Sequence, residues 1–154
     1  MYNEETWKIG EELARIYMKK HGYKIVYTNF DERGFELDIV AILSKKQQLK
    51  NLKIETKQKI KNAKTDKQKV LLKNNFKKLK GTLKDLLVIT EVKSRSDDRF
   101  GKGCECIDLK KRSHLIRGAK FLTQMEKFKG MQVRFDVASV DYNKVNYIEN
   151  SFCS

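Results

Sequence analysis

A lysine-rich segment divides this chain and limits where a hydrophobic core can form. Residues 45–84 hold fifteen lysines against Glu55 and Asp66, which accounts for +13 of the net charge of +14. The residues on either side are close to neutral and contain the longer apolar runs. We therefore expect a single domain over residues 1–154, with residues 45–84 as an insertion within it.

The part of the chain before the insertion predicts a helix followed by two strands. Residues 3–21 repeat apolar side chains, Trp7 among them, at three- and four-residue spacing, with Asn3 as a plausible N-cap. Residues 23–30 are rich in β-branched and aromatic side chains, and residues 35–43 alternate between polar and apolar side chains. The four residues between these two strands carry a turn signal ending in glycine.

The part after the insertion predicts three more strands and one more helix. Residues 86–93 and 133–140 have the composition of strands, and residues 145–149 predict a short fifth strand. Residues 108–128 predict a helix with Asp108 as its N-cap, and residues 94–105 before it predict a polar loop. The expected order is α-β-β-β-α-β-(β), an α/β fold with a mixed sheet flanked by helices.

The insertion has no clean hydrophobic period along its whole length. Residues 66–80 could form an amphipathic helix, but the rest has only scattered apolar side chains. We expect an insertion at the tip of a β-hairpin, partly mobile, because compact domains rarely need such a long connection. Its lysines favour a polyanionic partner, although biased composition is an alternative, since lysine outnumbers arginine 27 to 7.

Composition excludes several other classes of protein. No apolar run reaches the roughly 18 residues that a membrane span needs, and the N-terminus has no signal-peptide core. The three cysteines lack the spacing of a zinc site and are typical of reduced thiols. We therefore expect a cytoplasmic protein without a membrane-spanning segment.

Charged side chains lie within strands that otherwise look buried. Alternation places Glu36 and Asp38 on one face of the second strand, with Leu37 and Ile39 on the other. In the third strand it places Glu91 and Lys93 on one face, with Val92 opposite. Buried charges are costly unless they are paired or bind a metal, so two readings stay open. One is a structural salt bridge, and the other is a site for Mg²⁺ or Mn²⁺.

A metal site of this kind would suit the hydrolysis of phosphodiesters. That reaction needs a nucleophilic water and stabilisation of charge on the phosphoryl and leaving oxygens, which a carboxylate-bound metal supplies. Asp38 and Glu91 would be ligands, with the backbone carbonyl of Val92 as a third. Lys93 would neutralise the carboxylates or orient the water and the phosphate.

The chain resembles the YraN family, an uncharacterised bacterial group in the restriction-endonuclease-like PD-(D/E)xK superfamily. The resemblance rests on motifs that follow in the family's order over nearly the whole chain outside the insertion. They are Gly10-Glu11 with Ala14, Gly22-Tyr23 with Asn29, Arg33-Gly34-Phe35-Glu36-Leu37-Asp38-Ile39-Val40, Glu91-Val92-Lys93-Ser94-Arg95 with Phe100-Gly101, Lys111 with Leu115-Ile116-Arg117 and Ala119, Arg134-Phe135-Asp136-Val137, and Tyr147-Ile148-Glu149-Asn150-Ser151-Phe152. Phe35 departs from the glycine usual in the family, and the insertion lengthens the connection between the two acidic strands.

This resemblance implies that Asp38, Glu91 and Lys93 form the metal-binding and catalytic set. Glu11 matches an acidic residue that related junction-resolving nucleases place near the metal, although a solvated helix carboxylate is the alternative. Glu36 either supports the metal ligands or pairs with an arginine such as Arg95.

Four basic residues are candidates for contacts with nucleic acid. Arg95, Arg99 and Lys102 flank the site around a glycine-containing loop, where they either bind phosphate or face solvent. Lys111 lies in the first turn of a helix, where the helix dipole disfavours a cation, which hints at a phosphate partner.

The function predicted from these features is a metal-dependent nuclease acting on DNA, with branched or nicked DNA as the ligand. Two alternatives remain, a non-cutting nucleic-acid-binding module of the same fold and a protein-interaction adaptor. The oligomeric state is left open, with a homodimer as one alternative.

Overall fold

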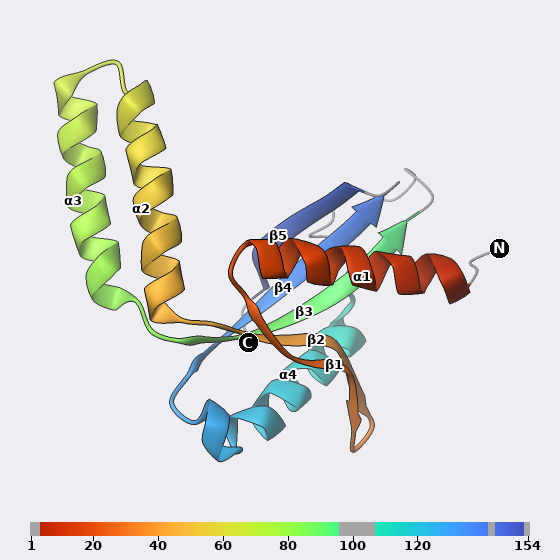
Figure 1. Cartoon of the computed structure of the whole chain (residues 1–154). Coiled ribbons are helices and arrows are strands. Elements are labelled where there is room, and N and C mark those ends of the chain that lie inside the picture. The colour runs from red at the N-terminus through yellow and green to blue at the C-terminus, as the bar shows by residue number, and fades with distance from the viewer. Residues whose placement is uncertain (1–3, 96–106, 142–143, 153–154) are drawn as a thin grey trace.

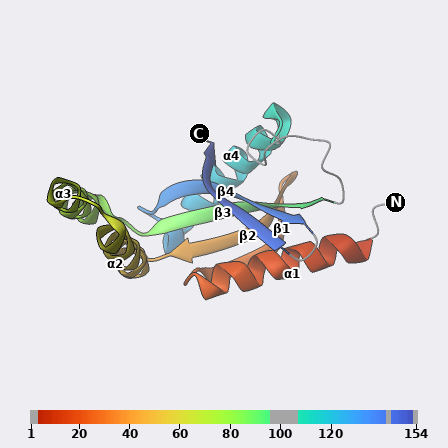
Figure 2. The ribbon, with the colours of Figure 1, turned by 90° about the horizontal axis from the view of Figure 1, so that it is seen from above.

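A five-stranded sheet carries one helix on each face, and a helical hairpin projects from one end (Figures 1 and 2). The computed structural model describes residues 4–95, 107–141 and 144–152. The elements are α1 (Glu4–Lys20), β1 (Lys24–Glu32), β2 (Phe35–Leu43), α2 (Lys45–Asn62), α3 (Asp66–Thr82), β3 (Leu86–Arg95), α4 (Leu109–Thr123), the 3₁₀ helix η2 (Glu126–Phe128), β4 (Gln132–Asp141) and β5 (Lys144–Phe152). The predicted order is confirmed, and the fifth strand is longer than expected. The predicted N-cap, Asn3, lies outside the described residues.

The sheet is mixed, as predicted. Its strand order is β1-β2-β3-β4-β5, in which β3 and β4 are parallel and every other neighbouring pair is antiparallel. The parallel pair needs a crossover connection, and α4 lies within it. Figure 2 shows α1 and α4 on opposite sides of the sheet.

The two faces of the sheet have separate hydrophobic cores. On the α1 side, Ala14 and Met18 pack with Val88 and Ala138. On the α4 side, fully buried leucines of the helix and sheet pack around Phe128. Each helix therefore buries one apolar stripe against a sheet whose two faces are both covered.

One predicted face assignment is wrong. Leu37 packs on the α4 side, whereas Ile39 packs on the α1 side with Ala41, so Leu37 and Ile39 do not share a face. The change of face occurs at Asp38, which lies opposite Asn29 of β1. Asn29 has a φ of 49°, a left-handed conformation that interrupts the regular pleat of a strand.

The lysine-rich segment forms two helices at the tip of the β2–β3 hairpin. Helix α3 confirms the helix predicted over residues 66–80, whereas α2 was not predicted. Ser44 accepts a hydrogen bond from the Gln47 amide at 3.2 Å, and Thr65 and Gln68 form a capping box. Neither helix has a buried residue. Their stability therefore rests on caps and on contact with each other rather than on burial in the core.

The helix predicted over residues 108–128 is shorter in the structure. Its predicted N-cap is confirmed, because Asp108 accepts a hydrogen bond from the Lys111 amide at 2.7 Å. Helix α4 ends at Thr123, and η2 follows it. The chain turns there because Phe128 is completely buried in the α4-side core, where a continued helix would not place it. None of the described helices combines the length and apolar character needed to cross a membrane.

The helical hairpin should be removable without loss of the sheet. Leu43 and Leu86 form the last β2–β3 pair, so an Asn-Gly type I′ turn can replace residues 44–85. We expect this variant to unfold cooperatively on heating and to lose the circular-dichroism signal of α2 and α3, because no residue of either helix is buried. A variant without a thermal transition would show that the hairpin is part of the folding unit.

Candidate functional site

The candidate site lies where β2 and β3 separate. The two strands pair from Leu43 and Leu86 as far as Ile39 and Thr90, and the pairing ends there. Strand β3 continues beside β4 as far as Arg95. Beyond the last pair, an Asp38 side-chain oxygen, Oδ2, accepts the backbone N–H of Val92 at 2.7 Å. A carboxylate therefore takes the place of a strand carbonyl and joins the two strands at the fork.

A pocket of about 410 Å³ opens at this fork. It is lined by side chains from α1, β2, β3 and α4, namely Trp7, Glu36, Asp38, Glu91, Val92, Lys93, Ser94 and Lys111. Six of these eight residues were predicted as site residues. The structure thus brings three of the four predicted carboxylates, all but Glu11, and two of the predicted cations to one pocket.

Glu91 is the centre of charge pairing in the pocket. Its carboxylate is buried and lies 3.4 Å from the ammonium of Lys93 and 2.9 Å from that of Lys111. The prediction that Glu91 and Lys93 share a face is confirmed. The partner of Lys111 in the described part of the chain is the carboxylate of Glu91. This ion pair accounts for a cation in the first turn of a helix, so no phosphate partner is needed to explain it. Burial lowers the pKa of Lys111, but the charge and hydrogen bond of Glu91, together with the charges of Asp38 and Glu36, outweigh burial and leave that pKa raised.

Asp38 has an unusual protonation equilibrium because of where it lies. Burial, followed by the negative charge of Glu91, raises the pKa of Asp38 to about 7. The Val92 amide and the charge of Lys111 oppose this rise without cancelling it. Two carboxylates that repel each other in a buried place would both be stabilised by an added cation. Perturbed groups of this kind cluster at functional sites.

Glu11 is buried beside this pair, not solvated. It is only 4% exposed, so the solvated alternative is wrong. Helix α1 approaches β3 closely at Gly10, where a Cβ would lie 2.0 Å from the Ser94 hydroxyl. One Glu11 oxygen accepts a hydrogen bond from Asn29 at 3.2 Å, while Oε1 has no partner among the residues described. The charge of Glu11 also contributes to the raised pKa of Asp38.

The side chains present suit a hard divalent cation in donor type. Asp38, Glu91 and Glu11 offer carboxylate oxygens, and the unpartnered Glu11 oxygen is free to accept a ligand. Within the described ranges, however, no three acidic, histidine or cysteine side chains are gathered closely enough to hold a metal as they stand. Glu91 is already paired with Lys93 and Lys111, so a cation would have to displace one of these ammonium groups.

The remaining predicted residues are placed only in part. Glu36 is exposed at the pocket, and its charge helps to raise the pKa of Lys111. Arg95 ends β3, but its side chain lies outside the described part, as do Arg99 and Lys102. The pairing of Glu36 with Arg95 stays a prediction. So do the phosphate contacts of Arg95, Arg99 and Lys102.

Two residues of the pocket were missed by the sequence analysis. Trp7 is 37% exposed at the pocket, although its helical spacing had assigned it to the apolar stripe of α1. Ser94 was assigned to a polar loop, but it belongs to β3 and its hydroxyl is buried without a partner among the described residues. The only signal in the sequence for Trp7 was its place near the start of a helix, where a tryptophan is expected to be partly exposed. The sequence carried no signal for Ser94.

A second buried network holds β3 in place from the other side. Asp136 of β4 forms a structural ion pair with Arg134 at 2.7 Å and accepts a hydrogen bond from the Tyr147 hydroxyl at 2.8 Å. The Tyr147 hydroxyl also lies 3.0 Å from the Thr90 hydroxyl. Thr90 directly precedes Glu91, so this network fixes the strand that carries the acidic site.

The arrangement of elements and the acidic fork together define a class of protein. A mixed sheet in the order α-β-β-β-α-β-β, with helices on both faces and acids on the second and third strands, is a restriction-endonuclease-like α/β fold.

The chain belongs to the uncharacterised protein family UPF0102, whose model matches residues 10–140, and the resemblance to the YraN family is thereby confirmed. A UPF0102 protein of Persephonella marina is 30% identical over 152 residues, covering 99% of this chain and 97% of the relative. A UPF0102 protein of Clostridium acetobutylicum is 29% identical over 156 residues, covering 97% and 95%. A third, of Caldicellulosiruptor saccharolyticus, is 29% identical and covers 99% and 100%.

The raised pKa of Asp38 predicts a specific loss of stability with pH. The unfolded chain releases this proton near its ordinary pKa of 3.8, whereas the folded protein holds it until about pH 7. The free energy of unfolding should therefore fall as pH rises between these values and then level off, by on the order of a few kcal/mol. Asp38→Asn keeps an acceptor for Val92 and should remove this fall in urea unfolding experiments.

Asp31→Asn serves as the control, because Asp31 is an exposed aspartate of β1. This variant should retain the full pH dependence of the wild type. An unchanged profile in Asp38→Asn would contradict the account of Asp38 as a buried carboxyl under repulsion.

Proposed function

We propose that this protein is a metal-dependent nuclease that hydrolyses DNA phosphodiesters, with branched or nicked DNA as its substrate. The observation that carries the proposal is the pocket at the β2–β3 fork, where Asp38 and Glu91 repel each other beside Lys93 and Lys111. The fold and the family support the placing of a site at these residues, and the chemistry is inferred from the side chains.

The acidic residues are the proposed metal ligands. Asp38 and Glu91 would hold Mg²⁺ or Mn²⁺, with Glu11 and the backbone of Val92 beside them. Such an ion, when bound, supplies a Lewis acid and lowers the pKa of its water. It would also lower the pKa of Asp38, which burial and the charge of Glu91 raise, because a cation favours both ionised carboxylates.

The two lysines are the proposed phosphate contacts. Their side chains are about 30% exposed, 31% for Lys93 and 28% for Lys111, so both reach the pocket from partly buried positions. Each ammonium pairs with Glu91 in the protein alone. When a substrate enters, each would leave Glu91 and bind a phosphate oxygen instead. Lys93 comes from β3 and Lys111 from α4, so they approach the phosphate from two different elements. Their charge would stabilise the negative charge that develops during cleavage.

One observation favours a non-cutting nucleic-acid-binding module instead. Glu91 already pairs with two lysines, so the charge of this carboxylate is compensated without a metal. A protein that had lost catalysis could keep such an arrangement for stability, because an uncompensated buried carboxylate is costly. This alternative predicts salt-dependent binding of DNA without turnover.

Cleavage assays with single substitutions test the proposal. Purified protein is incubated with nicked, branched and linear DNA in Mg²⁺, Mn²⁺ or a chelator. We expect metal-dependent cleavage, with Asp38→Ala and Lys93→Ala each losing at least about a hundredfold in rate, the scale of removing one group that stabilises the transition state. Exposed residues of β1 provide matched controls, Asp31→Ala and Lys24→Ala, which should cut at the wild-type rate.

Two outcomes would contradict the proposal in different ways. Equal cleavage by the wild type and both site variants would mean that the activity arises elsewhere or from a contaminant. Tight binding of DNA with no turnover in either metal would replace the nuclease with the binding module.

A further inference from the structure

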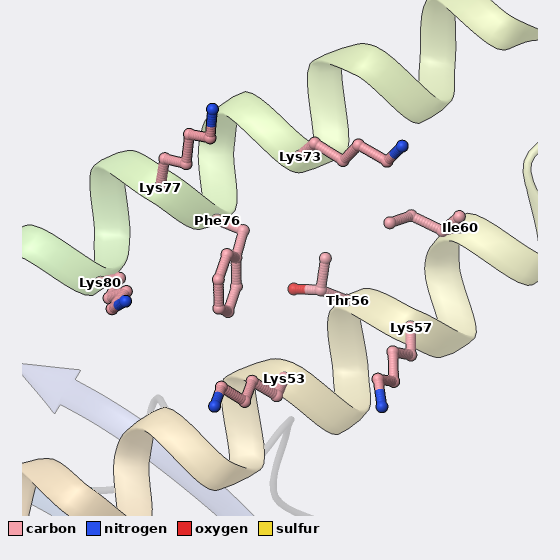
Figure 3. A pocket seen from close by; sticks show the side chains of 8 residues that line it. All are labelled: Lys53, Thr56, Lys57, Ile60, Lys73, Phe76, Lys77 and Lys80. Atoms are coloured by element: carbon pink, nitrogen blue, oxygen red, sulfur yellow. The ribbon is translucent and has the colours of Figure 1, made fainter.

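A second pocket lies away from the acidic site, between the helices of the lysine-rich hairpin. It has a volume of about 580 Å³ and is lined by residues of α2 and α3 alone, namely Lys53, Thr56, Lys57, Ile60, Lys73, Phe76, Lys77 and Lys80. Figure 3 shows the Phe76 ring extending from α3 into the gap between the helices, whereas the ends of the Lys57 and Lys77 side chains extend outward from it. We call these eight residues the hairpin groove.

The positive charge of the hairpin groove is uncompensated. In the part of the chain described by the structure, none of its five lysines lies within ion-pair distance of a carboxylate. The two acids of the segment are engaged elsewhere, Glu55 with Lys59 and Asp66 with Lys69. Five ammonium groups around one groove repel each other, so an anion that entered it would be stabilised by several of them at once.

The floor of the hairpin groove is apolar and partly aromatic. Phe76 and Ile60 are only partly buried, although neither helix packs against the sheet along its length. An aromatic ring between rows of cations suits a ligand with regularly spaced phosphates and flat apolar rings. A single strand of nucleic acid has both features, because its bases can stack on a side chain while its phosphates bind lysine. A duplex hides its bases and would leave Phe76 without a contact.

We propose that the hairpin groove binds a single strand of nucleic acid, with a base stacked on Phe76 and phosphates on the five lysines. The inference deepens the proposed function, since it gives the DNA substrate a single-stranded branch, but binding in the hairpin groove does not depend on cleavage. The hairpin leaves the sheet at Leu43 and Leu86, and Asp38 and Glu91 lie five residues further along the strands. The rise per residue of a strand and of a helix gives the length of this path from the acidic pocket to the hairpin groove. The two sites therefore lie at most about 35 Å apart. A single strand on the order of ten nucleotides long could therefore contact both.

Binding measurements without metal test this proposal separately from cleavage. Fluorescence anisotropy of a labelled oligonucleotide of about 20 nucleotides, longer than the usual site of one binding fold, is followed in a chelator. The groove variant combines Lys53→Gln, Lys73→Gln and Lys77→Gln. The control variant combines Lys50→Gln, Lys61→Gln and Lys78→Gln, which removes the same charge from exposed positions of the same helices outside the hairpin groove. Circular dichroism checks that both variants keep their helices.

We expect the groove variant to lose at least about tenfold in affinity, and its salt dependence to fall by about two in log–log slope. The control variant should change affinity by less than about threefold, as expected for charges that only add to the general field. Phe76→Leu, which keeps an apolar floor, should lose about tenfold for single strands and leave duplex binding unchanged. DNA and RNA strands of the same sequence show which of the two is preferred.

Three results would overturn the proposal. Equal losses in the groove and control variants would mean that diffuse charge, not the hairpin groove, holds the strand. Duplex binding as tight as single-strand binding, with no effect of Phe76→Leu, would replace the single strand with a duplex backbone. If the wild type bound no nucleic acid at physiological salt, the proposed ligand would be wrong, and the lysines of the hairpin groove would point to a different acidic partner. Cleavage could fail while this binding holds, so the two proposals fail separately.

Discussion

The hydrogen bond from the Val92 amide to the Asp38 carboxylate is the interaction on which the candidate site depends. It forms where the β2–β3 ladder ends, so a side chain completes what the backbone pairing leaves open. The bond holds Asp38 inward at a buried position and places it next to Glu91. Beyond the last β2–β3 pair, β2 is held by β1 and β3 by β4, and this bond is the link between them that carries the acidic site.

The charges of the pocket follow from this placement. Two buried carboxylates cannot both stay ionised without partners, and the protein supplies Lys93 from the same strand and Lys111 from α4. Burial, together with the remaining repulsion from Glu91, leaves the pKa of Asp38 raised. The same groups that stabilise the resting protein are those that a cation and a phosphate would use. A structural salt bridge and a catalytic site are therefore not exclusive readings of these residues.

The sequence predicted the framework and the acidic pair but not the details that set their geometry. Alternating side chains indicated that Glu91 and Lys93 share a face, because period two is a local property of a strand. The change of face at Asp38 was missed, because strict alternation assumes a regular strand pair and the left-handed conformation of Asn29 beside it interrupts that regularity. The pairing of Lys111 with Glu91 joins residues of two elements, so no local pattern could reveal it. Helix α2 was missed because its stability rests on capping and on α3 rather than on an apolar stripe facing the sheet.

A crystal grown or soaked with Mn²⁺ gives the most direct test of the central claim, that Asp38 and Glu91 form one metal-binding pair. We predict an anomalous difference peak between the two carboxylates, within about 2.5 Å of an oxygen of each, with at least one lysine ammonium moved away from Glu91. A well-ordered structure with full Mn²⁺ in the buffer, no peak at this position and both lysines still on Glu91 would contradict the account.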